Sequence, residues 1–230
     1  MRFPNVRRCL VVLLFMPIFI SFLFVNRVFL LLDYLIFPFF LFQNISKPVF
    51  IVGAPRSGTT YLYHSLAAKK QDFTCFELWE IVLAPSVIQK YVWLAIIKID
   101  KLIGGPIKWV VLKVEHLLIG NLKQIHPISI NMPEEDEAIL LWGLSSLLLN
   151  FFYPDSNYFD QYLRFDNAIS QRKRLSIMRS YKRYVKRHNF VFNRKGNKQF
   201  LAKNPLMMCK LASMNKVFPD GVILNIIRAP

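Results

Sequence analysis

Two long apolar runs dominate the first 42 residues of the chain. Residues 9–25 carry no charge, and residues 28–42 are interrupted only by Asp33 and Pro38. Because a helix needs roughly 17–25 apolar residues to cross a bilayer, the first run is near the lower limit and the second is shorter. The pattern therefore predicts one membrane span, with two separate spans as the alternative.

The charges that flank the first run indicate its orientation. Arg2, Arg7 and Arg8 precede it, and the positive-inside tendency predicts that this end lies in the cytoplasm. No small-residue cleavage site follows the run, which favours a retained anchor over a cleaved signal peptide. The side of the membrane on which the following domain lies depends on the number of spans, and both sides remain open.

A strand, a loop and a helix are predicted directly after this segment. Residues 49–52 form a continuous apolar run of the kind that is buried on both faces of a parallel sheet. Residues 53–58 are rich in turn formers, and residues 59–68 place apolar side chains at helical spacing. The pattern predicts an α/β domain over residues 47–230, after an N-terminal membrane segment of residues 1–46.

Further elements follow from the same patterns. Helices are expected within residues 81–120, 133–152, 172–187 and 206–217, and strands at residues 199–202 and 222–227, the last of them buried. Amphipathic helices in residues 81–120 are expected to cover the sheet, with interfacial membrane contact as the alternative. The expected fold is a P-loop-like parallel sheet flanked by helices.

Composition and charge restrict the class of ligand. Hydrophobic residues make up 54% of the chain, above the roughly 45–50% that is typical of a soluble domain. The net charge of +16 indicates an anionic partner such as a phosphate-rich ligand or acidic lipid headgroups. Nucleic acid is not expected, because the chain has no zinc-finger spacing or RNA-binding aromatic signature. Cys9, Cys75 and Cys209 are too far apart to suggest a disulfide framework or a metal site.

The segment from Gly53 to Thr60 has the chemistry of a phosphate-binding loop. Its glycine spacing is that of a Walker A loop, but Thr59 occupies the place of the nucleotide-binding lysine. Backbone N–H groups at the start of the following helix can still bind an anion. Arg56 adds a planar charge that suits phosphate or sulfate. The loop thus favours an anionic ligand over the β- and γ-phosphates of ATP.

The sequence PRSGTT at residues 55–60 resembles the 5′-phosphosulfate loop of sulfotransferases that use 3′-phosphoadenosine 5′-phosphosulfate (PAPS). The resemblance is to the branch of the tyrosylprotein sulfotransferases and the bacterial sulfotransferase-like proteins. It implies PAPS as the co-substrate, bound by Arg56, Ser57, Gly58, Thr59 and Thr60, with Arg56 also acting in catalysis.

Two later segments resemble the same family. Residues 201–205 are similar to its K-x-P segment, which implies that Lys203 reaches the bridging oxygen or the sulfonate. Residues 218–228 are similar to the segment whose arginine meets the 3′-phosphate, and this implies that role for Arg228. The family places a serine shortly beyond that arginine, and the sequence ends before it. The chain is therefore expected to be truncated at its C-terminus.

A general base is needed to accept the proton of an acceptor hydroxyl. Glu77 falls at the interval where tyrosylprotein sulfotransferases carry their catalytic glutamate, and an apolar setting would raise its pKa. Glu135 and Glu137 are the rivals for binding the acceptor or ordering the site, although acids at a helix start also suit the helix dipole. His126 is a weaker candidate, because a histidine before a proline is typical of a turn.

The sequence thus predicts a membrane-anchored, metal-independent enzyme that transfers a sulfonyl group from PAPS to an acceptor hydroxyl. A glycan, a lipid or a peptide is the expected acceptor, and the membrane is the expected location. Two alternatives remain: a degenerate P-loop kinase or NTPase, and a truncated, non-enzymatic membrane remnant of the fold.

Overall fold

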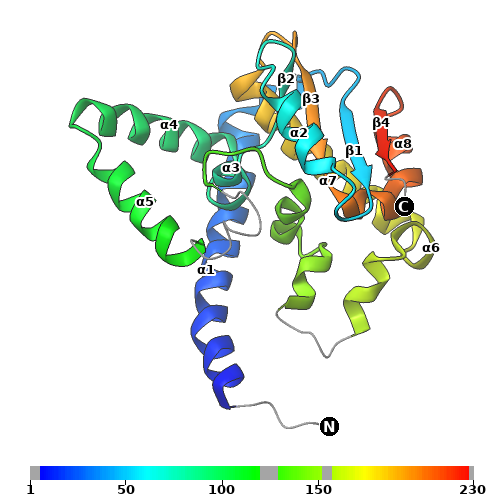
Figure 1. The fold of residues 1–230 in the computed structure, drawn as a ribbon, viewed down its shortest axis with the longest axis horizontal. Coiled ribbons are helices and arrows are strands. Elements are labelled where there is room, and N and C mark those ends of the chain that lie inside the picture. The colour runs from blue at the N-terminus through cyan, green and yellow to red at the C-terminus, as the bar shows by residue number, and fades with distance from the viewer. Residues whose placement is uncertain (1–5, 120–128, 152–156, 228–230) are drawn as a thin grey trace.

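The computed structural model describes residues 6–119, 129–151 and 157–227, which include a parallel four-stranded sheet flanked by helices (Figure 1). The strands are β1 (Val49–Gly53), β2 (Phe73–Thr74), β3 (Gln199–Lys203) and β4 (Val222–Ile226), in the spatial order β2-β3-β1-β4. β1 pairs in parallel with both β3 and β4, which confirms the predicted sheet.

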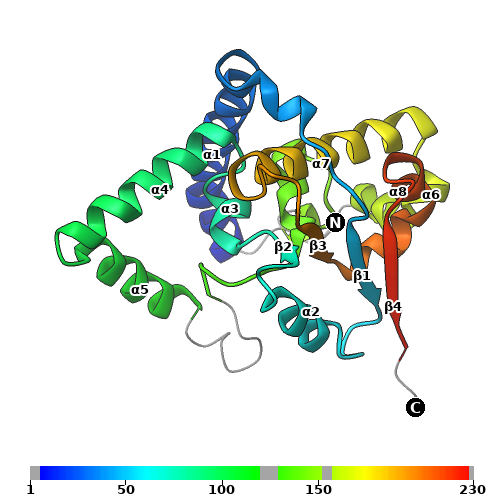
Figure 2. The ribbon, with the colours of Figure 1, turned by 90° about the horizontal axis from the view of Figure 1, so that it is seen from above.

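The side chains of β1 alternate between two hydrophobic clusters, as a strand's period of two requires. Val49 and Ile51 pack with α2 (Thr59–Ala67), and Phe50 and Val52 face the larger cluster that includes α7 (Gln171–Phe192). Figure 2 shows α2 and α7 on opposite faces of the sheet. This three-layer arrangement is the predicted α/β class.

The edge strand β4 differs from its prediction. The expectation was a buried strand, whereas Val222 and Ile223 are each 41% exposed. Within the described part of the chain, β4 is at the end of the sheet and pairs only with β1. An edge position leaves one side of a strand open, whatever its composition.

Two expected helices form differently from the prediction. The segment after Pro133 forms the 3₁₀ helices η3 (Asp136–Gly143) and η4 (Leu147–Phe151), separated by Leu144 at a φ of 49°. A left-handed residue ends a helix, so the predicted continuous α-helix is wrong. The helix expected at residues 206–217 is likewise divided, into η6 (Pro205–Lys210) and α8 (Leu211–Val217).

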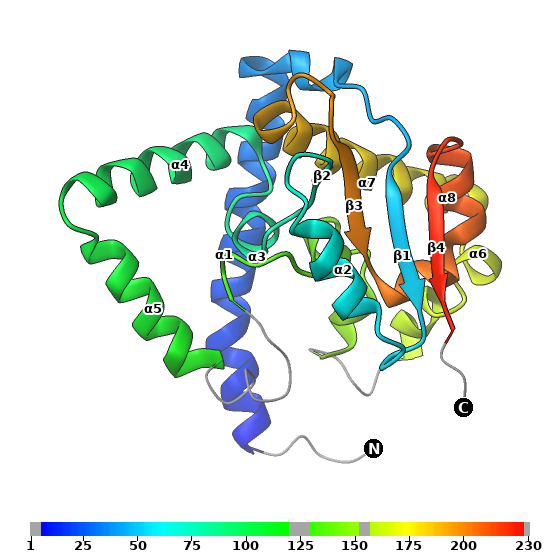
Figure 3. The ribbon, with the colours of Figure 1, turned by 45° about the horizontal axis from the view of Figure 1, so that its top comes forward.

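The remaining elements are shorter or lie beside the sheet. They are η1 (Pro38–Phe42), α3 (Leu78–Val82), α4 (Val87–Leu102), α5 (Pro106–Ile119), η5 (Asn157–Tyr162) and α6 (Phe165–Ala168). α4 packs against α1 (Val6–Ile36) and α7, and α5 packs against α4, so both project to one side of the sheet (Figure 3). The helices predicted in residues 81–120 therefore exist, but the prediction that they cover the sheet is wrong.

A single continuous helix, α1, joins the two apolar runs at the N-terminus. By length and composition, its stretch Leu13–Ile36 could cross a membrane. Only 6% of the most apolar 18 residues of this stretch are buried. Asn26 lies between the runs without breaking the helix, and its side-chain oxygen accepts a hydrogen bond of 2.6 Å from Gln89. The two runs therefore do not form two separate spanning helices in the described residues, so the alternative of two spans is not supported, and the single helix agrees with the prediction of one span.

A buried ion pair attaches the C-terminal half of α1 to the α/β domain. Arg187 Nε lies 2.7 Å from Asp33 Oδ2, and the two side chains are 3% and 0% exposed. Asp33 also accepts hydrogen bonds from the N–H groups of Val87 and Ile88, at 3.0 and 3.2 Å, and so caps α4. The Arg187 guanidinium stacks over the Phe40 ring, 4.2 Å from its centroid. One acid therefore joins α1, α4 and α7.

Substituting Arg187→Met should destabilise the protein strongly, because Asp33 would remain buried without its partner. Breaking a buried ion pair costs about 3–5 kcal/mol. Chemical denaturation in detergent measures the free energy of unfolding, with Arg179→Met on the exposed face of α7 as the matched control. The control should change stability by no more than about 0.5 kcal/mol. Equal effects of the two substitutions would show that the ion pair does not hold α1.

Candidate anion-binding and catalytic site

The loop between β1 and α2 turns the chain sharply at the carboxyl end of the sheet. Gly58 forms the N-cap of α2 at a φ of 95°, and Arg56 adopts a φ of 65°. A positive φ is easy for glycine and uncommon for arginine, which indicates a tightly constrained loop. The turn directs the first N–H groups of α2 toward the sheet edge, where open α/β sheets bind ligands.

Gly53 allows the loop to pass close to the neighbouring strand. A Cβ atom at this position would lie 2.8 Å from the Ile226 carbonyl oxygen, 2.9 Å from Thr59 Cγ2 and 3.0 Å from Ser57 Oγ. These separations are too short for any side chain, so the first glycine of the motif is required by packing. Gly58 is required instead by its backbone conformation.

One hydroxyl of the loop is buried without a hydrogen-bonding partner in the described residues. Ser57 Oγ has no such partner, although buried polar groups are normally satisfied. The loop borders a cavity of about 410 Å³ that is lined by residues 54–57, Met208 and residues 225–227. A ligand with acceptor oxygens would satisfy the Ser57 hydroxyl.

The parallel pairing of β1 with β3 brings Lys203 to this loop. Ile51 is in register with Lys203, the last residue of β3. The Lys203 ammonium donates a hydrogen bond of 3.0 Å to Thr60 Oγ1, and it forms an ion pair with Glu135. The lysine side chain is almost fully buried, so its charge acts in a region of low dielectric. Two of the segments singled out in the sequence therefore meet in space.

Glu77 lies at the start of α3, beside the chain segment that carries Glu135. Its carboxylate accepts a hydrogen bond of 2.8 Å from the Trp79 indole N–H. Burial raises the pKa of Glu77, and the neighbouring Glu80 raises it further, while the bond from Trp79 opposes the shift. The backbone of Glu77 bridges to Pro133. The contacts that the structure gives for Lys203 are with Thr60 and Glu135, not with Glu77.

Glu135 and Glu137 occupy different surroundings. Glu135 is about one-third exposed and pairs with Lys203. Glu137 is buried, 2.5 Å from Lys210 Nζ, and it accepts hydrogen bonds from Asn204 and Ser146 at 2.9 and 3.0 Å. Glu137 therefore has a structural role, whereas Glu135 belongs to the site.

A buried polar cluster behind Glu77 gave no signal in the sequence. Glu80 Oε2 lies 2.7 Å from His188 Nδ1 and 3.5 Å from Lys90 Nζ, and His188 Nε2 lies 2.6 Å from Thr74 Oγ1. Burial alone would raise the pKa of Glu80, but His188 and Lys90 together lower it. Glu80 also accepts a hydrogen bond of 3.1 Å from the Glu77 N–H, so the cluster positions the predicted base.

Two predicted residues cannot be placed. Arg228, expected at a 3′-phosphate, and His126, the weakest candidate base, both lie outside the described residues.

The fold and this loop define an α/β protein with a candidate anion-binding site at the carboxyl ends of parallel strands. The sequence profile of the Sulfotransferase family matches residues 48–230. The chain belongs to this family. No curated protein matches it by sequence.

Two solved sulfotransferases share the fold. Sulfotransferase STF9 from Mycobacterium avium aligns with a TM-score of 0.66 and 20% identity, over 91% of this chain and 50% of that one. Sulfotransferase STF1 from Mycobacterium tuberculosis H37Rv aligns with a TM-score of 0.61 and 17% identity, over 92% of this chain and 53% of that one. The chain therefore spans about half the length of the solved structures that it matches.

Substituting Gly53→Ala should destabilise the loop, because its new Cβ would meet the rigid carbonyl of Ile226. Overpacking of this kind costs about 1–3 kcal/mol. Gly143→Ala is the matched control, since a Cβ there would meet its nearest atom at 3.6 Å. Thermal unfolding of both variants measures the difference. An unchanged melting temperature for Gly53→Ala would contradict the close approach of β4 to the loop.

Proposed function

We propose that the chain transfers a sulfonyl group from PAPS to an acceptor hydroxyl. The observation that carries the proposal is the convergence of a buried lysine, Lys203, on the hydroxyl of Thr60 at the start of α2. The family match supports the same conclusion, as does the Ser57 hydroxyl, which has no hydrogen-bonding partner among the described residues.

The proposed donor contacts use the loop and the start of α2. Arg56 and the Ser57 hydroxyl bind the 5′-phosphosulfate, together with N–H and hydroxyl groups of residues 58–60. Arg228 is proposed to bind the 3′-phosphate by resemblance to the family alone. These groups are donors or cations, as an anionic ligand requires.

The proposed reaction needs a cation and a base. A new S–O bond forms to the acceptor oxygen as the bond from sulfur to the bridging phosphate oxygen breaks, and the electron pair leaves with adenosine 3′,5′-bisphosphate. Lys203 stabilises the charge on the leaving oxygen, and Glu77 accepts the hydroxyl proton. Glu135 is proposed as a positioning residue, because its ion pair holds Lys203 against Thr60.

We also propose that α1 anchors the enzyme to a membrane. Leu13, Leu14 and Ile18 are 69%, 68% and 59% exposed, which suits contact with lipid. From Phe19 onward, α1 contacts the domain: the Phe19 ring stacks with Trp142, and Asn26, Leu30 and Asp33 are buried. The catalytic domain is therefore held close to the membrane surface by a rigid helix, without a flexible linker.

Substituting Arg56→Ala should weaken the binding of adenosine 3′,5′-bisphosphate, measured by calorimetric titration. A hydrogen bond to a charged group contributes about 1.5–3 kcal/mol, so Kd should rise roughly 10- to 100-fold. Arg172→Ala, on the exposed start of α7, is the control and should leave Kd unchanged. If both variants bind the nucleotide as the parent does, the loop assignment is wrong, and Mg²⁺-dependent binding of ATP would favour the kinase alternative.

Substituting Glu77→Gln should lower kcat by roughly 10²–10⁴-fold while leaving nucleotide binding intact. Because burial raises the pKa of Glu77, its carboxyl is protonated and inactive at low pH, and the rate should rise with pH through a range above the ordinary value of 4.5.

The pH profile distinguishes the two glutamates of the site. Glu77→Gln should abolish the rising limb of the profile of kcat, whereas Glu135→Gln should lower the rate but keep that limb. Persistence of the limb in Glu77→Gln, with its loss in Glu135→Gln, would transfer the role of base to Glu135.

A further inference from the structure

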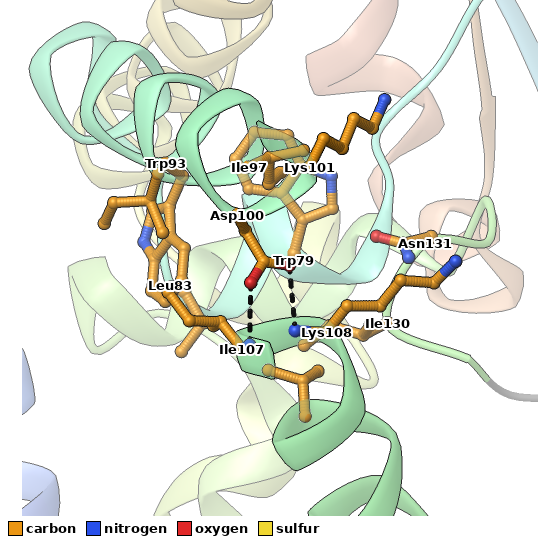
Figure 4. Close-up of a pocket in the computed structure, with 12 residues that line it drawn as sticks. Trp79, Leu83, Trp93, Ile97, Asp100, Lys101, Ile107, Lys108, Ile130 and Asn131 are labelled. Atoms are coloured by element: carbon orange, nitrogen blue, oxygen red, sulfur yellow. Dashed lines mark hydrogen bonds between the residues drawn. The ribbon is translucent and has the colours of Figure 1, made fainter. Parts of the chain in front are cut away.

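A second cavity, of about 330 Å³, lies between α3, α4, α5 and the segment around Ile130 (Figure 4). Its lining is mainly apolar and aromatic. The apolar lining residues are Trp79, Leu83, Trp93, Ile96, Ile97, Ile107, Val111 and Ile130. Pockets of this size and composition are typical of sites for small apolar ligands.

The polar groups at this cavity offer little to a carbohydrate. Asp100 is buried, and its two carboxylate oxygens already accept hydrogen bonds from the N–H groups of Ile107 and Lys108, at 2.7 and 3.0 Å (Figure 4). The other polar lining residues are Lys101, Lys108 and Asn131. A sugar ring would therefore lose hydrogen bonds to water without adequate replacement, whereas an alkyl chain would lose none.

Trp79 forms a shared wall between this cavity and the proposed base. Its ring lines the cavity, and its indole N–H donates the hydrogen bond of 2.8 Å to Glu77. The Trp79 side chain therefore lies between the cavity and the carboxylate of Glu77.

A short segment that begins with a turn at residues 129–132 connects the cavity with the proposed donor site. Residues 130–135 run beside residues 76–79, as shown by the bonds from Trp79 N to the Ile130 oxygen at 3.0 Å and from Glu134 N to the Phe76 oxygen at 3.2 Å. Ile130 lines the cavity, whereas Glu135 contacts Lys203. Five residue steps of about 3.3 Å each set an upper limit of ~17 Å on the separation of these ends, and the turn at residues 129–132 shortens it. A molecule that occupies both must reach along this segment.

The outer faces of α4 and α5 are apolar and rich in lysine. Leu102, Ile103 and Leu117 are 80%, 60% and 83% exposed. Exposed lysines are interspersed with these residues, at positions 98, 101, 108 and 113. A large exposed apolar surface marks an interaction site, and apolar helices with basic residues bind anionic lipid surfaces. The cavity therefore opens within a helical pair that suits a membrane interface.

We propose that the cavity between α4 and α5 binds the apolar chain of a long, hydroxyl-bearing membrane amphiphile and presents its hydroxyl to Glu77. The reaction in this inference rests on the proposed sulfonyl transfer. The binding of the apolar chain is argued from the cavity alone. It names a lipid alcohol as the acceptor class, in preference to a glycan or a peptide.

Filling the cavity tests the proposal. Val111→Phe places a larger side chain in the lining, and Val110→Phe is the matched control, because the adjacent Val110 is 50% exposed and does not line the cavity. The full chain in nanodiscs is titrated with ω-bromododecanol, whose bromine quenches the fluorescence of nearby tryptophans such as Trp79 and Trp93. Val111→Phe should raise the apparent Kd from the quenching titration by at least about tenfold, the lower end of the effect of one methylene group in an apolar pocket. Val110→Phe should leave it unchanged.

A second readout separates this inference from the proposed function. The parent protein with PAPS should sulfate dodecanol with a higher kcat/KM than butanol, and Val111→Phe should remove most of that preference. Quenching that depends on Val111 without any sulfation supports the cavity and contradicts the sulfotransfer. Sulfation without a preference for chain length, or identical quenching in both valine variants, overturns the inference.

Discussion

The site depends on the parallel pairing of β1 with β3. This pairing aligns Lys203, the last residue of β3, with Ile51 shortly before the glycine-bounded loop, and the Lys203 ammonium lies 3.0 Å from the Thr60 hydroxyl. Parallel strands direct their carboxyl ends to one edge of the sheet, so residues distant in the chain meet there. The buried lysine would be costly without Glu135, and their ion pair therefore links the sheet edge to the segment that also borders Glu77.

Buried ionic groups elsewhere organise the elements that surround this edge. The pair of Asp33 with Arg187 attaches α1 and the start of α4 to α7. The next residue of α7, His188, contacts Glu80, which in turn accepts a hydrogen bond from the backbone of Glu77. The helix that we propose as a membrane anchor and the residue that we propose as a base are thus both fixed by α7. A rigid connection of this kind suits an enzyme whose acceptor lies in a membrane.

Local sequence determined the elements of the fold that are continuous in the chain. The apolar run before Gly53, the glycine spacing of the loop and the periodicity of the following helix are short-range patterns, and the strand–loop–helix unit and strand β3 were predicted correctly from them. Fold class and family also followed from the sequence. The periodicity of apolar residues after Pro133 could not distinguish an α-helix from 3₁₀ turns. The left-handed Leu144 and the buried contacts of Glu137 interrupt the helix there.

Tertiary structure alone decided the contacts that shape the site. Lys203 and Glu135 are 68 residues apart, Glu80 and His188 are 108 apart, and Asp33 and Arg187 are 154 apart. Family resemblance singled out Lys203 and made Glu135 a candidate, but no local pattern predicted that the two would pair or distinguished the other residues from ordinary surface charges, because burial depends on which elements pack together. For the same reason the sequence showed α4 and α5 as amphipathic helices, and only their packing beside the sheet revealed a cavity next to Trp79. Secondary-structure propensity and the spacing of apolar residues depend on residues that are close in the chain. Desolvation and ion pairing depend on which distant residues the fold brings together.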